Sequence, residues 1–178
     1  MRVFIGVTGA SGQVYARRLA EVLLEEGVEV EACVTRAAER VMRREGERLP
    51  EGVRRYDPED LSAPPASGTY RVDGYVVCPC SLTTLASVAA GIGSDLVKRA
   101  AIVALKEGRR LVLVVRETPW PVSALRAALE LAREGATILP ACPAFYHRPE
   151  DVMDLVDYVV QKVLDALGLE VDLVRYAD

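Results

Sequence analysis

Short apolar runs alternate along this chain with stretches of helical periodicity. The apolar runs lie at residues 2–8, 28–35, 74–78, 111–115 and 137–139, and the helical stretches at residues 14–26, 37–45, 81–90, 95–107, 122–134 and 151–167. Strands that are apolar on both faces are typical of a parallel sheet with helices on either side. The alternation therefore predicts an α/β fold with one doubly wound, Rossmann-like parallel sheet, in a single domain that spans residues 1–178. Residues 46–69 lack periodicity and are expected to form a long loop that is functional or buried in an interface.

The charge and composition argue against several classes of protein. The net charge of −4 argues against binding of nucleic acid through bulk electrostatics. No apolar run is long enough to span a membrane, and residues 2–8 read as a strand rather than a signal peptide, so we expect a cytoplasmic protein. The chain has no asparagine and only Gln13 and Gln161 for glutamine, which suggests a thermophile, although its arginine excess can equally reflect codon bias.

The cysteines and the single histidine do not suggest a metal site. Cys33 and Cys78 lie in strand-like runs, where we expect them to act as small core residues. The run Cys78-Pro79-Cys80 resembles half of a metal site, but a structural zinc site needs two ligand pairs and His147 is the only histidine. We expect no bound metal, and we interpret His147 as a loop residue without a catalytic role rather than as a general base.

Polar or turn-forming residues follow each predicted strand. In a doubly wound sheet, ligands bind outside the carboxyl ends of the strands, here after Thr8, Thr35, Cys78, Val115 and Leu139. The small residues Gly9-Ala10-Ser11-Gly12 allow close approach of a phosphate to a helix N-terminus, although a tight turn without a ligand explains them equally well. The run lacks the GxGxxG pattern, and Thr35 stands where an acidic residue would bind a ribose, which argues against NAD.

Other candidate residues have both a structural and a functional interpretation. Ser81 in Ser81-Leu82-Thr83-Thr84 is expected to cap a helix, and the same run offers donors to a heterocycle or phosphate. Arg99 and Lys106 are two helical turns apart on one face, either as solvated charges or as part of an anion pocket. The pair Arg116-Glu117 directly follows a strand, which favours a function for it.

Taken together, these stretches resemble the UbiX family of flavin prenyltransferases over nearly the whole chain. The resemblance lies in the order and spacing of Thr8-Gly9-Ala10-Ser11-Gly12, Ala63-Pro64-Pro65-Ala66-Ser67-Gly68, Cys78-Pro79-Cys80-Ser81, Arg99-Ala100-Ala101, Ala104-Leu105-Lys106-Glu107, residues 111–117, Ile138-Leu139-Pro140, Phe145-Tyr146 and Asp154-Leu155-Val156-Asp157. It implies transfer of a dimethylallyl group from dimethylallyl monophosphate to N5 and C6 of reduced FMN, which produces prenyl-FMN for a decarboxylase of the UbiD type. It also implies a homododecamer with active sites at subunit interfaces.

The resemblance also implies roles for individual residues. The FMN-binding residues would be Gly9, Ala10, Ser11, Thr35, Ser81, Leu82, Thr83, Thr84 and Arg116. The allylic phosphate would be bound by Arg99, Lys106, Tyr146 and Lys162, and the catalytic residues would be Ser11, Glu45, Lys106 and Glu117, with the two glutamates as acid/base groups. Cations of this kind would stabilise the charge that develops on a departing phosphate.

The sequence departs from the family pattern at four positions. The family commonly has histidine where this chain has Ala124, and an acidic residue where it has Ile102. Some members have tryptophan at the position of Leu61 and arginine at that of Lys162. A lysine at 162 gives up the bidentate contact that arginine makes with phosphate. The chain also lacks a DDxxD-like run for magnesium, which suits a monophosphate donor. The alternatives are a flavin carrier without transferase activity and a flavin-dependent decarboxylase, although a cysteine decarboxylase would need an asparagine motif that is absent here.

Overall fold

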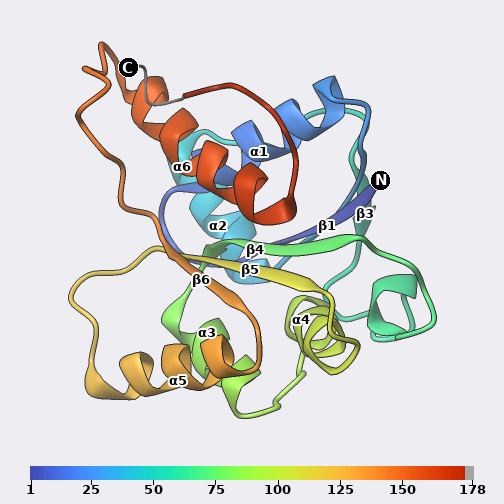
Figure 1. Ribbon diagram of the computed structural model, residues 1–178. Helices are drawn as coiled ribbons and strands as arrows, with labels where there is room; N and C mark the ends of the chain where they lie inside the picture. Colours follow the sequence, from blue (N-terminus) through green and yellow to red (C-terminus); the bar gives the residue numbers. More distant parts are fainter. Residues whose placement is uncertain (175–178) are drawn as a thin grey trace.

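Six parallel strands form one sheet, in the order β3-β2-β1-β4-β5-β6 (Figure 1). The structure is a computed structural model, and it describes residues 1–174. The strands are β1 (Arg2–Val7), β2 (Glu29–Val34), β3 (Arg54–Tyr56), β4 (Gly74–Cys80), β5 (Arg110–Val115) and β6 (Thr137–Pro140). Each neighbouring pair is parallel, which confirms the predicted doubly wound α/β fold.

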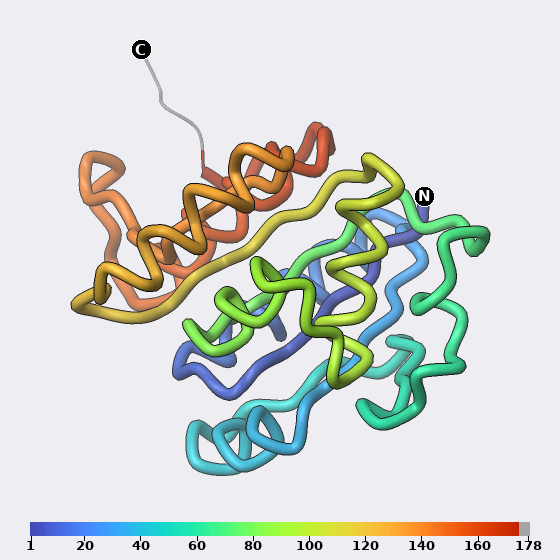
Figure 2. The backbone as a smooth tube through the Cα atoms, turned by 90° about the horizontal axis from the view of Figure 1, so that it is seen from below, coloured from blue at the N-terminus to red at the C-terminus, as the bar shows by residue number. Residues whose placement is uncertain are grey.

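Helices cover both faces of the sheet, as Figures 1 and 2 show from two sides. One face is packed by α1 (Gln13–Glu25), α2 (Arg36–Glu45) and α6 (Val152–Leu167), and the other by α3 (Leu82–Ala89), α4 (Leu96–Lys106) and α5 (Val122–Arg133). Alternate residues of each central strand enter one or the other of the two cores, because successive side chains of a strand point to opposite faces. Within residues 1–174, none of the helices has the length and apolar character needed to cross a bilayer.

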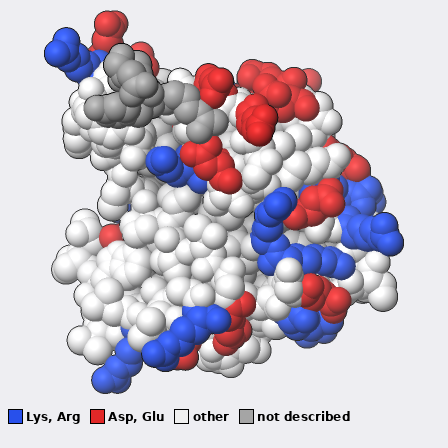
Figure 3. Space-filling model, in the orientation of Figure 1, with Lys and Arg blue, Asp and Glu red and all other residues white. Residues whose placement is uncertain are grey.

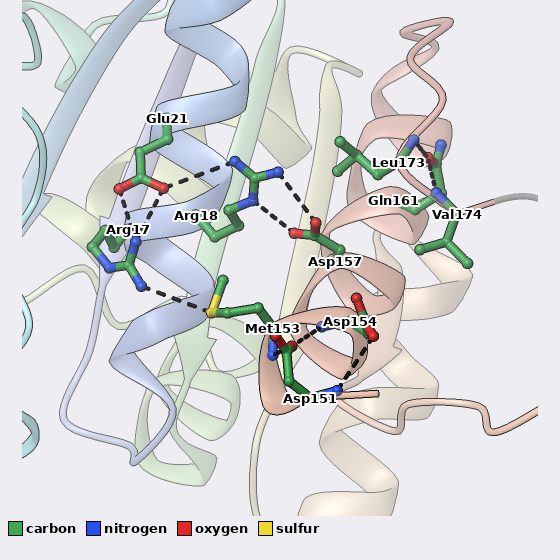
Figure 4. A network of polar contacts seen from close by, with 10 residues as sticks. All are labelled: Arg17, Arg18, Glu21, Asp151, Met153, Asp154, Asp157, Gln161, Leu173 and Val174. Atoms are coloured by element: carbon green, nitrogen blue, oxygen red, sulfur yellow. Dashed lines mark hydrogen bonds and ion pairs between the residues drawn. The ribbon is translucent and has the colours of Figure 1, made fainter. Parts of the chain in front are cut away.

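The N-cap side chains of α2, α3, α4 and α6 accept hydrogen bonds from backbone N–H groups that have no intrahelical partner. Thr35 accepts a hydrogen bond from the Ala38 N–H, and Ser81 accepts one from the Thr84 N–H. Asp151 and Asp154 form a capping box at the start of α6 (Figure 4). The acidic residues at the start of α6 therefore serve helix capping.

An ion pair and a sulfur contact join α6 to α1 at the edge of their interface. Arg18 donates to the Asp157 carboxylate at 2.7 Å, while Arg17 pairs with Glu21 and also contacts the sulfur of Met153 (Figure 4). Each of these charged side chains is partly exposed, so the ion pairs stabilise the interface less than the apolar contacts beneath them. Asp157, three residues after Asp154, thus has a structural partner on α1.

The long segment between α2 and β4 contains two short elements that the sequence pattern does not predict. These are the strand β3 and a turn of 3-10 helix, Pro64–Ala66. The segment is held by Glu31, a fully buried carboxylate on β2 that accepts hydrogen bonds from the hydroxyls of Tyr56 at 3.0 Å and Tyr70 at 2.6 Å. The prediction of a loop over residues 46–69 is therefore wrong for the short edge strand.

Candidate functional site

The carboxyl ends of β1 and β4 lie side by side at the centre of the sheet. The chain leaves β1 for α1 on one face and leaves β4 for α3 on the other, so a crevice opens between the two loops. Thr8 joins the loops, because its buried hydroxyl donates to the Pro79 carbonyl at 2.7 Å and accepts the Ser81 N–H at 2.9 Å. The predicted binding runs that begin at Gly9 and Ser81 are thus held together.

A cavity of about 290 Å³ lies at this crevice. Hydroxyl-bearing residues and the N-terminal ends of three helices surround it, because the N-cap residues Thr35 of α2, Ser81 of α3 and Asp95 of α4 line it. The other lining residues are Thr8, Gly9, Ala37, Thr83, Thr84 and Lys98. Helix N-termini carry a partial positive charge and orient N–H groups towards anions. The donor set therefore fits a phosphate group such as that of FMN.

Asp95 and Lys98 are lining residues that the sequence reasoning missed. Lys98 pairs with Asp95 at 2.8 Å and donates to the Ser94 hydroxyl at 2.9 Å, so its ammonium is held beside the cavity. In the sequence the two residues look like an ordinary helix cap and a surface charge three positions later. The available signal was that Lys98 is one of only three lysines in the chain.

The loop after β1 packs closely on α2. A Cβ atom added to Gly9 would lie 2.6 Å from the Cβ of Ala37, and Gly12 has a φ of 91°, which favours glycine. Glu45, at the end of α2, accepts hydrogen bonds from the backbone N–H groups of Gly12 at 3.1 Å and Gln13 at 2.8 Å. Its carboxylate therefore occupies the N-terminus of α1, where the sequence analysis placed free N–H groups for a phosphate.

Three of the predicted site residues meet at this loop. Arg116, directly after β5, donates from Nε to the Ser11 carbonyl at 3.1 Å, and Glu45 bonds the next residue along the loop. Ser11 itself is exposed, so its hydroxyl is accessible beside the Arg116 guanidinium. The structure brings Ser11 from the loop after β1, Glu45 from the end of α2 and Arg116 from the loop after β5 together.

A second cavity, of about 710 Å³, opens on the other side of Arg116. Its wall is largely apolar and includes Trp120, Leu125 and Phe145, with Glu117 at one end. The Glu117 backbone carbonyl accepts the Trp120 indole N–H at 2.9 Å. In Figure 3 the surface around the loop that follows β5 is mostly uncharged. An apolar or aromatic group fits this cavity better than a charged one does.

Tyr146 and Lys162 lie in one cluster around Tyr158. The Tyr146 and Tyr158 rings are 6.0 Å apart, and Lys162 Nζ lies 5.7 Å from the centre of the Tyr158 ring. Partial desolvation and, as the second cause, the hydrogen bond with Tyr158 raise the pKa of Tyr146. Its hydroxyl therefore stays protonated and can donate. The His147 ring stacks parallel to Tyr158, and its nitrogens have no hydrogen-bond partner in residues 1–174.

Arg99 and Lys106 share an exposed face of α4, as their spacing predicts. Lys106 pairs with Glu107, and its side chain keeps 55% of its surface exposed. At ~1.5 Å rise per residue along α4, Lys106 lies about 12 Å beyond Lys98, which lines the cavity at the start of the helix. One copy of the chain therefore does not bring Lys106 to its own cavity beside Ser81.

The cysteines and acidic residues offer no alternative centre in residues 1–174. No three or more His, Cys, Asp or Glu side chains gather there as possible metal ligands. Burial raises the pKa of Cys33 and of Cys80 from 9.0 to about 12, so both thiols stay protonated. Cys142 is an exposed thiol beside the apolar cavity.

The chain is similar to known flavoproteins along its full length. The model of the family described as Flavoprotein matches residues 1–164. The flavin prenyltransferase UbiX of Archaeoglobus fulgidus is 44% identical over 182 residues, which cover 99% of this chain and 100% of that protein. The crystal structure of AnUbiX (PadA1) in complex with FMN and dimethylallyl pyrophosphate is similar with a TM-score of 0.95 and 37% identity, over 99% of this chain and 97% of that one. A dodecameric FMN-dependent UbiX-like decarboxylase from Escherichia coli O157:H7 has a TM-score of 0.95 and 39% identity, over 100% of both chains.

Proposed function

We propose that this chain, which belongs to the UbiX family of flavin prenyltransferases, transfers a dimethylallyl group from dimethylallyl monophosphate to N5 and C6 of reduced FMN. The observation that carries the proposal is similarity along the full length to a flavin prenyltransferase, at 44% identity, and to a structure that holds both FMN and a prenyl donor. The product is prenyl-FMN, so FMN serves as the acceptor substrate of the reaction.

The residues at the carboxyl edge of the sheet fit FMN. The cavity lined by Thr35, Ser81 and Thr84 suits its phosphate, with Lys98 as an additional cation. The further FMN-binding residues are Gly9, Ala10, Ser11, Leu82, Thr83 and Arg116. Support for this assignment comes from Thr8, which ties the Gly9 loop to the Ser81 loop, and from the bond between Arg116 and the Ser11 carbonyl.

Reduced FMN supplies the electron-rich N5 and C6 atoms that accept the five-carbon unit. The chain contributes Arg99, Lys106, Tyr146 and Lys162, which stabilise the phosphate as it leaves with the electron pair of the broken C–O bond. Glu45 and Glu117 accept the protons released from N5 and C6 and return one to the dimethylallyl double bond. Ser11 precedes Gly12, whose N–H group bonds Glu45, and orients the reacting atoms.

A mass measurement tests the reaction. Purified protein is mixed anaerobically with reduced FMN and dimethylallyl monophosphate, and the extracted flavin is weighed by mass spectrometry. We expect a gain of one five-carbon unit, with free phosphate as the second product. Flavin that is bound but unchanged would identify a carrier and overturn the proposal. A parallel reaction with the pyrophosphate determines which donor the chain accepts.

We also propose that the active site is completed by a second copy within a homododecamer. The support is the position of Lys106, about 12 Å along α4 from Lys98 at the Ser81 cavity, and an exposed apolar stripe on α5 formed by Val122, Leu125 and Leu129. Mixed oligomers of Lys106→Ala and Glu117→Gln chains test this. If the two residues act from different copies, about one site in four regains both groups and activity returns. Mixtures as inactive as their parents would contradict the proposal.

The product has a proposed destination and setting. We propose that prenyl-FMN passes to a UbiD-type decarboxylase in the cytoplasm of a thermophile, where the absence of asparagine limits deamidation. The purified chain, reduced FMN and donor should activate an apo-decarboxylase that reduced FMN alone does not activate. A thermal midpoint in the range of mesophilic domains, about 45–65 °C, would contradict the thermophilic setting.

A further inference from the structure

Arg109 holds a short segment of the long loop in place through three hydrogen bonds. Its Nη2 donates to the Gly68 carbonyl at 2.5 Å, and its Nη1 donates to the Tyr70 carbonyl at 2.7 Å and to the Tyr75 hydroxyl at 3.1 Å. Tyr75 is almost fully buried, so the guanidinium is itself fixed against the core. A planar guanidinium can donate to several acceptors at defined angles, which a lysine cannot do.

The same segment is anchored a second time at Tyr70. The Tyr70 hydroxyl donates to Glu31 at 2.6 Å, and the Glu31 carboxylate is fully buried on β2. Residues 68–70 are therefore tied to the sheet both by their backbone carbonyls and by a side chain. Loops with so many fixed polar contacts keep a defined position, unlike most surface loops.

This anchored backbone lies directly against Lys106. A Cβ atom added to Gly68 would be 2.7 Å from Lys106 Nζ and even closer to the Glu107 carboxylate that pairs with it. Contacts below 3.0 Å cannot persist, so a side chain at position 68 would displace the Lys106–Glu107 ion pair. The absence of a side chain at Gly68 thus lets the ammonium rest on the loop backbone.

We propose that Arg109 is a positioning residue for the donor phosphate, because it holds residues 68–70 as a wall that fixes the Lys106 ammonium. The inference rests on the proposed function, in which Lys106 binds that phosphate. An exposed lysine has many rotamers, and a fixed wall on one side reduces the number available before the substrate arrives. Arg109 does not touch the substrate in this account and acts only through Gly68 and Tyr70.

The substitution Gly68→Ala tests the wall with little risk to folding. Gly68 is partly exposed and its backbone has no positive φ, so alanine is compatible with the fold. We expect the KM for dimethylallyl monophosphate to rise about fivefold, with kcat within about twofold and the affinity for FMN unchanged. A merely structural defect would lower the active fraction, and with it kcat, without moving KM.

Two adjacent arginines provide a matched pair of variants. Arg109→Lys removes the guanidinium that donates to both the Gly68 and the Tyr70 carbonyls. It should therefore raise KM in the same way as Gly68→Ala. Arg110→Lys alters the neighbouring residue, whose guanidinium bonds the Leu167 carbonyl at 3.0 Å at the end of α6, and should leave KM unchanged. Equal KM values for the Arg109→Lys and Arg110→Lys chains would contradict the inference.

A double-mutant cycle identifies Lys106 as the route of the effect. In a chain that already carries Lys106→Ala, Gly68→Ala should change neither KM nor the equilibrium affinity for dimethylallyl monophosphate further. An undiminished effect in that background would show that Gly68 acts by another route and would overturn the inference. If the unmodified chain makes no prenyl-FMN, the proposed function itself fails. Normal turnover with unchanged KM in the Gly68→Ala chain removes only this inference.

Discussion

Glu45 is expected to have two separable roles, which substitution can distinguish. Its carboxylate accepts the N–H groups of Gly12 at 3.1 Å and Gln13 at 2.8 Å, at the positive end of α1. The first N–H groups of a helix have no partner within the helix, so Glu45 caps α1 from the end of α2. Glu45→Ala removes both the charge and the acceptors, whereas Glu45→Gln removes the charge and one oxygen but keeps one acceptor oxygen, which can accept both N–H groups as Oε2 does here.

The size of each effect follows from these contacts. Hydrogen bonds to a charged group contribute ~1.5–3 kcal/mol when buried, and a helix cap contributes ~1 kcal/mol. Because Glu45 is exposed, we expect Glu45→Ala to lower the free energy of unfolding by ~1–2 kcal/mol. For Glu45→Gln only the interaction with the helix dipole is lost, which corresponds to ~0.3–1 kcal/mol. If Glu45 is also a proton acceptor, both variants lose prenylation.

Urea unfolding at a fixed protein concentration measures the difference as a shift of the midpoint at constant slope. Glu39→Ala is the matched control on the same helix, since Glu39 makes only an exposed ion pair with Arg36 at 3.4 Å. A midpoint for Glu45→Ala no lower than that of Glu39→Ala would show that the cap energy has been overestimated. Full prenylation by Glu45→Gln would leave Glu45 with a structural role alone.

Three further expectations follow from the same geometry. Lys106→Ala should retain FMN, as followed by fluorescence titration, and lose prenylation by ~10²-fold or more, since one preorganised donor to developing charge has an effect of that size. Gly9→Ala should weaken FMN binding and lower the unfolding free energy by ~1–3 kcal/mol in urea melts, because the new methyl group would lie 2.6 Å from the Ala37 Cβ. Burial raises the pKa of Cys33 from 9.0 to about 12, so the folded chain keeps a proton that the unfolded chain releases. Stability is then complete below pH ~9 and falls as the pH rises from there, by ~1.4 kcal/mol per unit for this thiol; Cys33→Ala should make that decline shallower in urea melts at several pH values.

The sequence predicts most of the fold because its elements have strong patterns. The apolar runs that became β1 and β5, and the capped helices α3 and α6, lie within two residues of their expected ends. The exception is β3, whose residues Arg54-Arg55-Tyr56 show no apolar alternation. A short edge strand pairs through its backbone with one neighbour only, so its side chains carry little signal of the pairing.

The candidate site could be predicted in part for a similar reason. Parallel strands place their carboxyl ends at one edge, so the Gly9, Thr35 and Ser81 runs could be expected to meet, and they line one cavity. Lys98 was missed because a helix repeats every 3.6 residues and the sequence alone did not show which face of α4 meets the crevice. The resemblance to the UbiX family is confirmed by the full-length similarity.

The two ends of α4 explain why one copy of the chain has only part of the proposed site. Its N-terminal end presents Asp95 and Lys98 to the cavity of the same chain, and its last residue, Lys106, lies about 12 Å along the helix from Lys98. A helix packed along its length against the sheet cannot bend to bring both ends to one ligand. If Lys106 binds the donor phosphate, that phosphate lies away from the cavity beside Ser81, which is consistent with the proposed site shared between two copies. On this view α4 sets a fixed distance between neighbouring sites, and dissociation of the oligomer should abolish prenylation while each copy keeps the residues that bind FMN.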